Sequence, residues 1–363
     1  MNPIDVHTIG DSTLDNVYWL LNENGTNIQE AKTQCVEGQL QIKLNEGNNH
    51  LYQVVSHAYD GFTTESLLNG DTVGRVLPGI APKRVSKEGR SYLQCKGIDP
   101  LANSFEINPL SKMKSAVMAD PEATHYVVLS VGGNDFREQL LNPIKMLGSI
   151  PEIHKRYDQI LNVLKNDFQG KKIKPILMLQ YRLDANNDAY WIYTILRVIG
   201  AVTLAINALS AAALIASLGL LSASITATTA IIFALLGAVG LMVSNKILPL
   251  RLTWKVLSGQ EVGMAALGAL MERFYQPILK RAKEESIPIL DLPNTFNPYK
   301  PLYIASIEPN VEGGKLIAEG INHIVKNHDY HSSSKLYAKS GSQTEFSASD
   351  NPGYSGWRVK SAR

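Results

Sequence analysis

The segment "TIGDSTLDN", residues 8–16, places a serine directly after a run of residues that is typical of a buried strand. Apolar residues at helical spacing follow in "TLDNVYWLL", so Ser12 is expected between the carboxyl end of a strand and the start of a helix. Its backbone N–H then points outward near the positive end of the helix dipole, where an oxyanion can be held. A serine in this place is also an ordinary helix cap. Ser12 is therefore a candidate nucleophile that still needs a base and oxyanion donors.

Two further polar motifs follow the next strand-like runs along the chain. Gly61 lies in "YDGFTTES" and offers a backbone N–H in a tight turn that favours glycine. Asn134 lies in "SVGGNDF", just past two glycines, and carries a side-chain amide that can donate hydrogen bonds. Each is, taken singly, also an ordinary turn residue or helix cap. In a parallel sheet the carboxyl ends of the strands share one edge, so we expect Ser12, Gly61 and Asn134 to converge there.

These motifs resemble a known family. "GDS" at 10–12, Gly61 and "GGND" at 132–135 are similar to the first three signature blocks of the SGNH, or GDSL-type, hydrolases, and the likeness covers roughly residues 4–184 and 263–326. The resemblance implies a flavodoxin-like α/β/α sandwich with a parallel sheet, Ser12 as nucleophile, and an oxyanion hole built from Ser12, Gly61 and Asn134. It also implies hydrolysis of esters of lipids, carbohydrate acetates or thioesters. The G-x-S-x-G elbow of the α/β-hydrolases is absent around Ser12.

The fourth signature block departs from the family. The family has Asp-x-x-His-Pro before a glycine and an amphipathic helix, whereas this chain has "ASIEPNVEGGKLIAEGI". Ala305 stands where the Asp is expected and Glu308 where the His is expected. The paired change preserves charge, because a neutral His with an Asp carries one negative charge and so does a lone Glu. The chain therefore resembles a variant branch in which Glu308 is the base.

A glutamate is a weaker base than a histidine, since their ordinary pKa values are about 4.3 and about 6.5. Burial of the Glu308 carboxylate can recover part of that difference. The alternative is a catalytically inactive SGNH scaffold that serves as a membrane-localised binding protein. Candidate supporting residues are Asp11, Asp135, Asp291 and His57. His57 lies in a strand-like run, where a packed or exposed histidine is expected, and Asp291 in "ILDLP" is also typical of a loop cap.

The elements that must position these residues alternate between two patterns. Strand-like apolar runs recur as "DVHTIG", "LYQVVSHAYDG", "HYVVLSVGGND", "KPILMLQY" and "IPILDLP", with helical patterns between them. Such alternation predicts an α/β fold, in which helices cover both faces of a parallel sheet.

The alternation is interrupted by a long apolar block. Residues 198–245 contain no charged residue, which is long enough for two membrane crossings of about 20 residues each joined by a turn. We expect an inserted transmembrane helical hairpin, and the alternative is a buried hairpin that forms a soluble lid. Basic residues flank the block at Arg182, Arg197, Lys246, Arg251 and Lys255, which places the globular part on the cytosolic side of a membrane.

The remaining sequence sets the domain boundaries and the partners. Residues 1–184 and 263–330 are predicted to form a two-part SGNH-like domain, 185–262 the inserted hairpin with its flanks, and 331–363 a disordered Ser-, Gly- and Lys-rich tail. A net charge of +2 gives no reason to expect nucleic acid. Only Cys35 and Cys95 are present and no Cys/His cluster is apparent, so neither a metal nor another cofactor is predicted. No secretory signal is recognised at the start. The expected partners are a lipid bilayer and a small-molecule or lipid ester.

Overall fold

The structure is a computed structural model of the chain. It describes residues 4–24, 27–47, 51–70, 86–101, 106–140, 143–181, 183–184, 201–202, 204–216, 262–305, 307–339 and 357–361. The chain divides into two compact units. The first comprises Met1–Glu138, Ser149–Asn186 and Pro277–Arg363, and the second comprises Gln139–Gly148 and Asn187–Gln276.

The first unit is built on a seven-stranded sheet in the order β2-β1-β3-β4-β5-β8-β9. Its strands are β1 (Ile4–Gly10), β2 (Tyr52–Ala58), β3 (Thr124–Ser130), β4 (Lys172–Leu179), β5 (Ile289–Asp291), β8 (Lys335–Lys339) and β9 (Trp357–Ser361). The first six in that order pair in parallel, and β9 adds an antiparallel edge strand. The predicted α/β fold with a parallel sheet is confirmed, and the order 2-1-3-4-5 of the first five strands is consistent with a flavodoxin-like fold.

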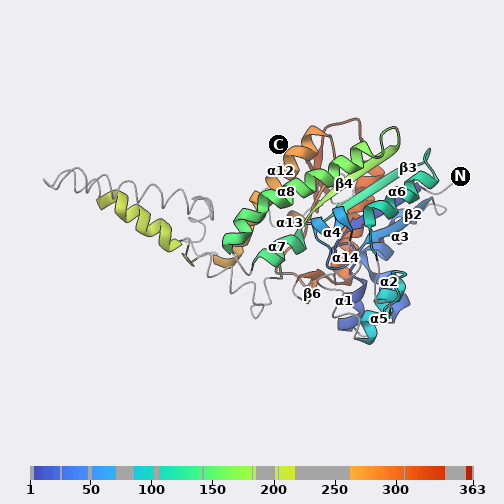
Figure 1. The fold of residues 1–363 in the computed structure, drawn as a ribbon, viewed down its shortest axis with the longest axis horizontal. Helices are drawn as coiled ribbons and strands as arrows, with labels where there is room; N and C mark the ends of the chain where they lie inside the picture. Colours follow the sequence, from blue (N-terminus) through green and yellow to red (C-terminus); the bar gives the residue numbers. More distant parts are fainter. Residues whose placement is uncertain are drawn as a thin grey trace. The chain divides into compact units, whose positions relative to one another are not determined.

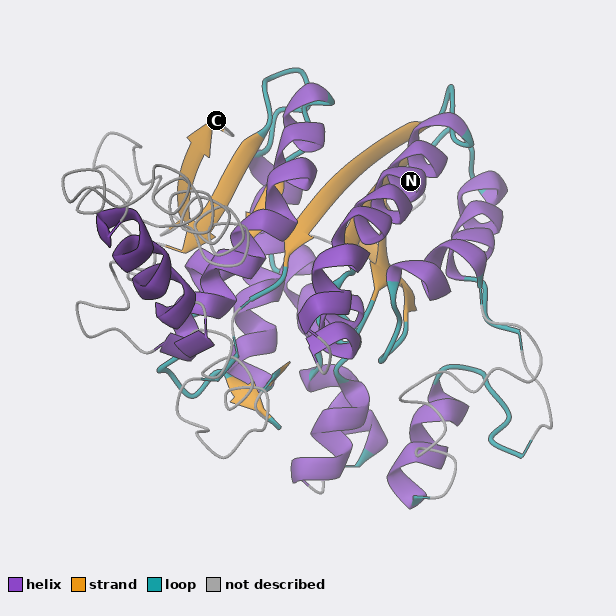
Figure 2. Cartoon of the chain, turned by 60° about the vertical axis from the view of Figure 1, so that its left-hand side comes forward, coloured by secondary structure: helices purple, strands orange, loops and turns teal. Residues whose placement is uncertain are grey.

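Helices cover both faces of the sheet, as Figures 1 and 2 show. The helices with defined bounds are α1 (Val17–Asn24), α2 (Ile28–Gln34), α3 (Val36–Asn45), α4 (Thr64–Asn69), α5 (Lys87–Cys95), α6 (Pro109–Ala119), α7 (Gly133–Leu140), α8 (Pro143–Asn166), α12 (Val262–Glu284), α13 (Leu292–Thr295) and α14 (Val311–Asn327), of which α1, α2 and α5 pack against one another. On one face, α3 and α14 pack against each other and against strands of the sheet. On the other face, α6 packs on β1 and β2.

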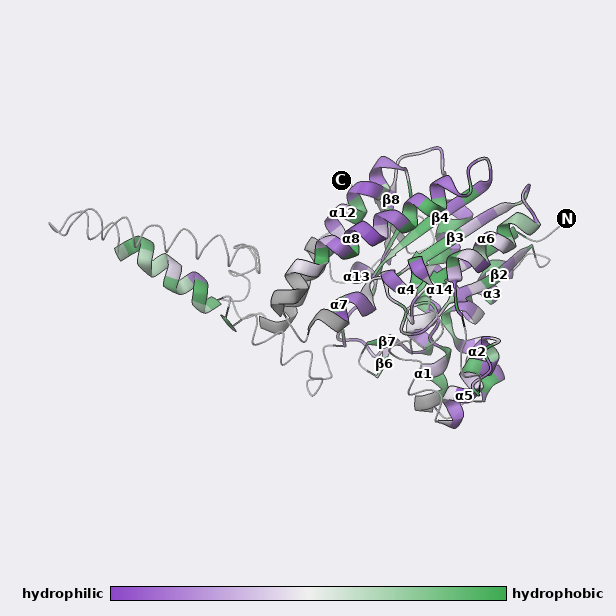
Figure 3. Cartoon of the chain, in the orientation of Figure 1, coloured by the Kyte–Doolittle hydropathy of each residue, from purple (hydrophilic) through white to green (hydrophobic). Residues whose placement is uncertain are grey.

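The core follows from the alternation of side chains along the buried strands. Val6 of β1 and Val128 of β3 point to the face covered by α3 and α14, where they join a core with Leu40 and Ile321. Ile9 and the other odd-numbered residues of β1 point to the opposite face. The second halves of β3 and β4 are hydrophobic (Figure 3), as expected for parallel strands buried on both sides.

A small hairpin lies outside the main sheet. Strands β6 (Tyr303–Ile304) and β7 (Glu308–Pro309) pair antiparallel, with Ile304 opposite Glu308. Ala305, in the bend between them, has a φ of 51°, a left-handed conformation that few residues other than glycine adopt. The position that resembles the family's Asp is therefore part of a tight bend.

Of two predictions about the rest of the chain, the disordered tail needs correction and the membrane hairpin stays a prediction. The prediction of a disordered tail over 331–363 is wrong for β8 and β9. Tyr337 of β8 is 2% exposed and belongs to the core, Ala338 is also buried, and the strand pairs with β5. No helix among the described ranges is both long enough and apolar enough to cross a bilayer. Most of the apolar block lies outside the described residues.

The described part of that block is helical over residues 201–202 and 204–216, within the second unit. Figure 3 shows hydrophobic residues along most of it. Its large apolar side chains Leu209 and Ile215 are 72% and 70% exposed, whereas Asn207 and Ser210 are only 9% and 6% exposed. This helix therefore presents apolar side chains outward and small polar ones inward.

Candidate active site

Ser12 and Glu308 meet in the first unit. The Ser12 hydroxyl and the Glu308 carboxylate share a side-chain hydrogen bond, although nearly three hundred residues separate them in the sequence. Both are buried, with 6% of Ser12 and 2% of Glu308 exposed to solvent. A carboxylate can only accept, so the serine hydroxyl is the donor when Glu308 is ionised. This is the contact that a nucleophile and its base require.

Ser12 is held in a single turn at the end of β1. The backbone N–H groups of Leu14 and Asp15 both donate to the Asp11 carbonyl, at 3.1 Å each. Gly10 has a φ of 145°, and a Cβ atom there would lie only 1.7 Å from the carbonyl oxygen of Ser130. Only glycine fits this close approach of β1 to β3. Ser12 thus lies between strand and helix as predicted, with one short turn intervening before α1.

Glu308 is held by contacts of its own hairpin and by Asn16. The Asn310 N–H donates to the Leu302 carbonyl at 3.0 Å, which closes the hairpin. The Asn16 side chain donates from Nδ2 to the Pro309 carbonyl at 2.8 Å and accepts from the Val36 N–H at 2.9 Å. One amide therefore joins the segment that follows Ser12 to the strand that carries Glu308.

Gly313 allows α14 to begin directly behind this hairpin. A Cβ atom at Gly313 would lie 2.3 Å from the Leu302 carbonyl oxygen, so the helix approaches the backbone of the hairpin too closely for any other residue. Asn310 caps the helix by accepting from the Gly313 N–H at 2.9 Å. The Pro-x-x-x-Gly-Gly spacing after Glu308 thus has a packing reason.

The surroundings make Glu308 a strong base. Burial and the nearby carboxylate of Asp60 together raise its pKa to about 8, against the hydrogen bond from Ser12 and the positive charge of Arg137, which lower it. Ordinary glutamate titrates at about 4.3 and ordinary histidine at about 6.5. Glu308 therefore holds a proton more tightly than a typical histidine does, and the loss of basicity expected for a glutamate is more than recovered.

An aromatic cluster contributes to the dry surroundings of the carboxylate. Tyr181, Phe296 and Tyr303 pack together, with the rings of Tyr181 and Phe296 stacked at 4.6 Å between centroids. Burial raises the pKa of Tyr181 well above its ordinary value, and the charge of Glu308 acts in the same direction. The charge of Glu308 therefore reaches the Tyr181 hydroxyl.

The candidate oxyanion donors lie at the ends of the two neighbouring strands. Gly61 has a φ of 88°, so its turn does favour glycine. Asn134 is 6% exposed and donates from Nδ2 to the Phe62 carbonyl at 3.0 Å. An asparagine amide has two N–H bonds, so this contact uses one of them and fixes the direction of the other. The same contact ties Asn134 to the turn that contains Gly61.

Two of the candidate supporting carboxylates hold the ends of the strands together. Asp11 accepts from the Thr13 N–H at 3.1 Å, from Gln180 Nε2 at 3.0 Å and from Ser130 Oγ at 3.3 Å. Burial raises the pKa of Asp11 to about 7, against these hydrogen bonds. Asp11 therefore links the turn of Ser12 to β3 and to the residue after β4.

Asp135 performs a similar task one strand away. It accepts from the Thr64 N–H at 2.7 Å and from the Thr64 hydroxyl at 2.6 Å, and it pairs with Arg156 at 3.2 Å. These contacts join α7 to the start of α4. Asp135 is thus bonded to the frame of the site, while the preceding residue Asn134 faces the turn of Gly61.

The other two supporting candidates, Asp291 and His57, make hydrogen bonds to residues other than Ser12. Asp291 caps α13 by accepting from the Asn294 N–H at 3.2 Å, so it does act as a loop cap. His57 is 5% exposed, and its Nε2 lies 3.1 Å from Nδ1 of His7. It is packed against another histidine on the face of the sheet covered by α6.

Four residues that surround Ser12, Glu308 and their neighbours were not predicted from the sequence. Asn16, Asp60, Arg137 and Tyr181 have no family motif to mark them, although each stands within five residues of a position that was singled out or of a strand end. The signal that was available is position alone, because polar residues that follow strand ends in a parallel sheet gather at one edge.

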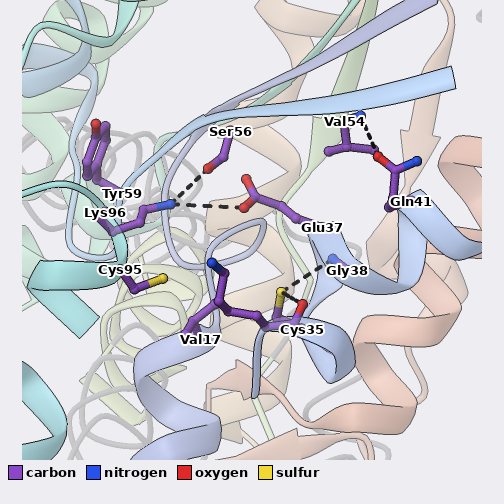
Figure 4. Close-up of a pocket in the computed structure, with 11 residues that line it drawn as sticks. Val17, Cys35, Glu37, Gly38, Gln41, Val54, Ser56, Tyr59, Cys95 and Lys96 are labelled. Atoms are coloured by element: carbon purple, nitrogen blue, oxygen red, sulfur yellow. Dashed lines mark hydrogen bonds and ion pairs between the residues drawn. The ribbon is translucent and has the colours of Figure 1, made fainter. Parts of the chain in front are cut away.

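A separate cavity of about 360 Å³ opens beside α3, β2 and α5 (Figure 4). Lys96 crosses it with its ammonium 2.8 Å from Ser56 Oγ, 3.2 Å from an Asp15 carboxylate oxygen and 4.0 Å from Glu37. Ser12, Gly61, Asn134 and Glu308 do not line this cavity. The buried charges at this cavity are paired with one another, so they form a structural ion-pair network.

Comparison with known proteins leaves the family open. No protein-family model matches the chain, and no curated protein matches it. One solved crystal structure aligns with 90% of this chain and 98% of its own, at 11% sequence identity and a TM-score of 0.43. A likeness at this level carries no argument about fold or function.

Proposed function

We propose that this protein is a serine ester hydrolase of the SGNH type in which Glu308 replaces the usual Asp and His. The observation that carries the proposal is the buried hydrogen bond between Ser12 and Glu308, together with the raised pKa of that glutamate. A buried serine and glutamate are in contact after β1, and an anchored asparagine amide and a left-handed glycine follow the two neighbouring strands; together they are the groups that acyl transfer needs.

The reaction follows from these contacts. The ionised Glu308 carboxylate takes the hydroxyl proton as Ser12 Oγ attacks the ester carbonyl carbon, and the carbonyl π electrons move to oxygen. The resulting oxyanion is held by the N–H groups of Ser12 and Gly61 and by the free N–H of Asn134 Nδ2. When the bond to the alcohol breaks, Glu308 returns the proton to the departing alkoxide. Water then attacks the acyl-serine, and the same carboxylate takes its proton and passes it to Ser12.

The substrate class that we propose is an ester with an acyl chain at a membrane surface. Two observations support contact with lipid: the uncharged stretch 198–245, and the outward Leu209 and Ile215 of the helix over 204–216. In a membrane, apolar side chains face lipid and small polar ones face neighbouring helices. The flanking basic residues favour a globular part on the cytosolic side.

Ester hydrolysis by purified protein tests the activity. Short- and medium-chain p-nitrophenyl esters are hydrolysed by the wild type at pH 9, and Ser12→Ala reduces kcat/KM to background. The matched control is Ser111→Ala, which removes an exposed serine hydroxyl from α6 and leaves the rate unchanged. Equal rates for Ser12→Ala and wild type, or no hydrolysis by either across the pH range, would favour a binding scaffold over an enzyme.

Extraction of membranes with alkaline carbonate tests the localisation. A chain anchored by a hydrophobic hairpin stays in the pellet, and detergent releases it. Release by carbonate alone contradicts the anchor and favours a soluble lid. This result leaves the assignment of Ser12 and Glu308 untouched.

A further inference from the structure

A cluster of three histidines and one aspartate lies on the α6 face of the sheet, with Asp5 and His125 near the starts of their strands and His57 near the end of β2. Asp5 and His7 come from β1, His57 from β2 and His125 from β3. All three rings are 5% exposed or less. His7 Nε2 lies 3.1 Å from His125 Nδ1, and His125 Nδ1 lies 3.7 Å from Asp5 Oδ2.

We propose that Asp5, His7 and His125 form a binding site for one divalent first-row transition-metal ion, with Zn²⁺ as its test ion. Their three ligand atoms lie within 4.8 Å of one another. Two ligands at 2.0–2.1 Å from a tetrahedral Zn²⁺ are about 3.4 Å apart, close to the two separations given above. Two imidazoles with one carboxylate suit Zn²⁺ and its neighbours and do not suit Mg²⁺ or Ca²⁺, which prefer oxygen ligands.

The second contacts of both imidazoles support this assignment. His125 Nε2 lies 2.8 Å from the Asp120 carbonyl oxygen, so this nitrogen carries the proton and the lone pair is on Nδ1, the atom that faces His7 and Asp5. His7 Nδ1 lies 3.1 Å from His57 Nε2. Metal-bound histidines nearly always donate their other N–H to a fixed acceptor, and here the Asp120 carbonyl and the His57 ring supply both acceptors.

The rings also have a satisfied arrangement without an ion. His57 then donates to His7, His7 donates to His125, and His125 donates to the Asp120 carbonyl. Binding of a metal moves the proton of His7 from Nε2 to Nδ1 and that of His57 from Nε2 to Nδ1. No buried nitrogen along these contacts loses its partner, so the site can load and unload without unfolding the sheet.

Charge and access favour a cation at this place. The Asp5 side chain is 22% exposed, which gives an ion a path from solvent to the buried rings. The carboxylate of Asp120 is close enough to act on Asp5, so a second negative charge lies nearby. The bound ion would pin the start of β1 to β3 and leave a coordination position toward solvent for water.

This inference is independent of the proposed hydrolase. Three strand residues separate His7 from the end of β1 at Gly10, which is about 10 Å at about 3.3 Å per residue, and Ser12 lies in the turn beyond that end. The site has no sequence motif of short Cys/His spacing, because His7 and His125 are 118 residues apart in the chain.

Zinc titration of the full chain tests the proposal. The purified, untagged protein is freed of metal with a chelator, dialysed, and titrated with ZnCl₂ against a chromogenic competitor. One equivalent binds to the wild type and is not displaced by millimolar Mg²⁺. Substitution with Co²⁺ gives the visible absorption of a low-symmetry cobalt site with nitrogen ligands.

Variants then assign the ligands. Asp5→Asn, at the part-exposed ligand, weakens Zn²⁺ binding at least about tenfold, His125→Gln removes it, and His57→Gln weakens it by about 10- to 100-fold through His7. His331→Gln, at an exposed histidine, is the matched control and binds as the wild type does. Circular dichroism confirms folding, and if His125→Gln does not fold, Asp5→Asn decides. No stoichiometric Zn²⁺ binding, or unchanged binding in folded Asp5→Asn, would overturn the proposal.

Discussion

The pH dependence of ester hydrolysis depends on the ionisation of Glu308. With a pKa of about 8, about 1% of Glu308 is ionised at pH 6, about 10% at pH 7 and about half at pH 8. If the ionised form is the base, kcat/KM rises about tenfold from pH 6 to pH 7, about fivefold from pH 7 to pH 8, and levels off above pH 9. A solvated glutamate would give a flat profile over the same range.

Two substitutions move this profile in opposite directions. The charge of Arg137 lowers the pKa of Glu308 and that of Asp60 raises it. Arg137→Met therefore moves the midpoint of kcat/KM to higher pH, and Asp60→Asn moves it to lower pH. The assay is initial-rate hydrolysis of a p-nitrophenyl ester from pH 5.5 to 9.5 at constant ionic strength, corrected for spontaneous hydrolysis. A profile that is flat, or that shifts the same way in both variants, would refute the role of Glu308 as base.

Three further predictions concern the frame of the site. Asn134→Ala lowers kcat by about 10²–10³-fold with little change in KM, because it removes a donor to the oxyanion, and steady-state kinetics checks this. Asn16→Ala leaves the buried Val36 N–H and Pro309 carbonyl without their partner, so urea unfolding shows a loss of about 1–3 kcal/mol and kcat falls with it. Glu308→Gln changes how stability depends on pH. In the wild type, the Glu308 carboxyl of the native state stays protonated between pH values of about 4.5 and about 8, whereas that of the unfolded state ionises. Wild-type stability therefore falls as pH rises through this window. The variant lacks this loss, and its stability relative to wild type, measured by urea unfolding at pH 5 and pH 8, therefore increases with pH; a constant difference would count against the raised pKa.

The strands and their order along the chain were accessible to sequence reasoning because they carry a strong signal. Apolar runs bounded by glycine and aspartate marked β1 to β5, and polar residues that follow such strands must gather at one edge of a parallel sheet. The contact between Ser12 and Glu308 could be anticipated for this reason and from the spacing of Pro309 and Gly313. What sequence could not supply was the pKa of Glu308, since that depends on residues such as Asp60 and Arg137 that meet it only in the folded chain.

The predictions that were wrong or incomplete also have physical reasons in particular residues. Residues 335–339 were assigned to a disordered tail because their composition is polar, yet Tyr337 and Ala338 are buried where β8 extends the sheet. His57 was expected to be packed or exposed and is packed, but its partner His7 lies 50 residues away on a neighbouring strand, and no periodicity links them. Side chains that meet across parallel strands leave no pattern in the sequence.

Labelling with a fluorophosphonate tests the central proposal, that Glu308 activates Ser12, most directly. At pH 9 the wild type is modified at Ser12, as peptide mass spectrometry locates, and Glu308→Gln reacts at least about 100-fold more slowly. Glu312→Gln, which changes an exposed glutamate four residues further along, reacts at the wild-type rate. Modification of Glu308→Gln at the wild-type rate, or modification at a residue other than Ser12, would contradict the account.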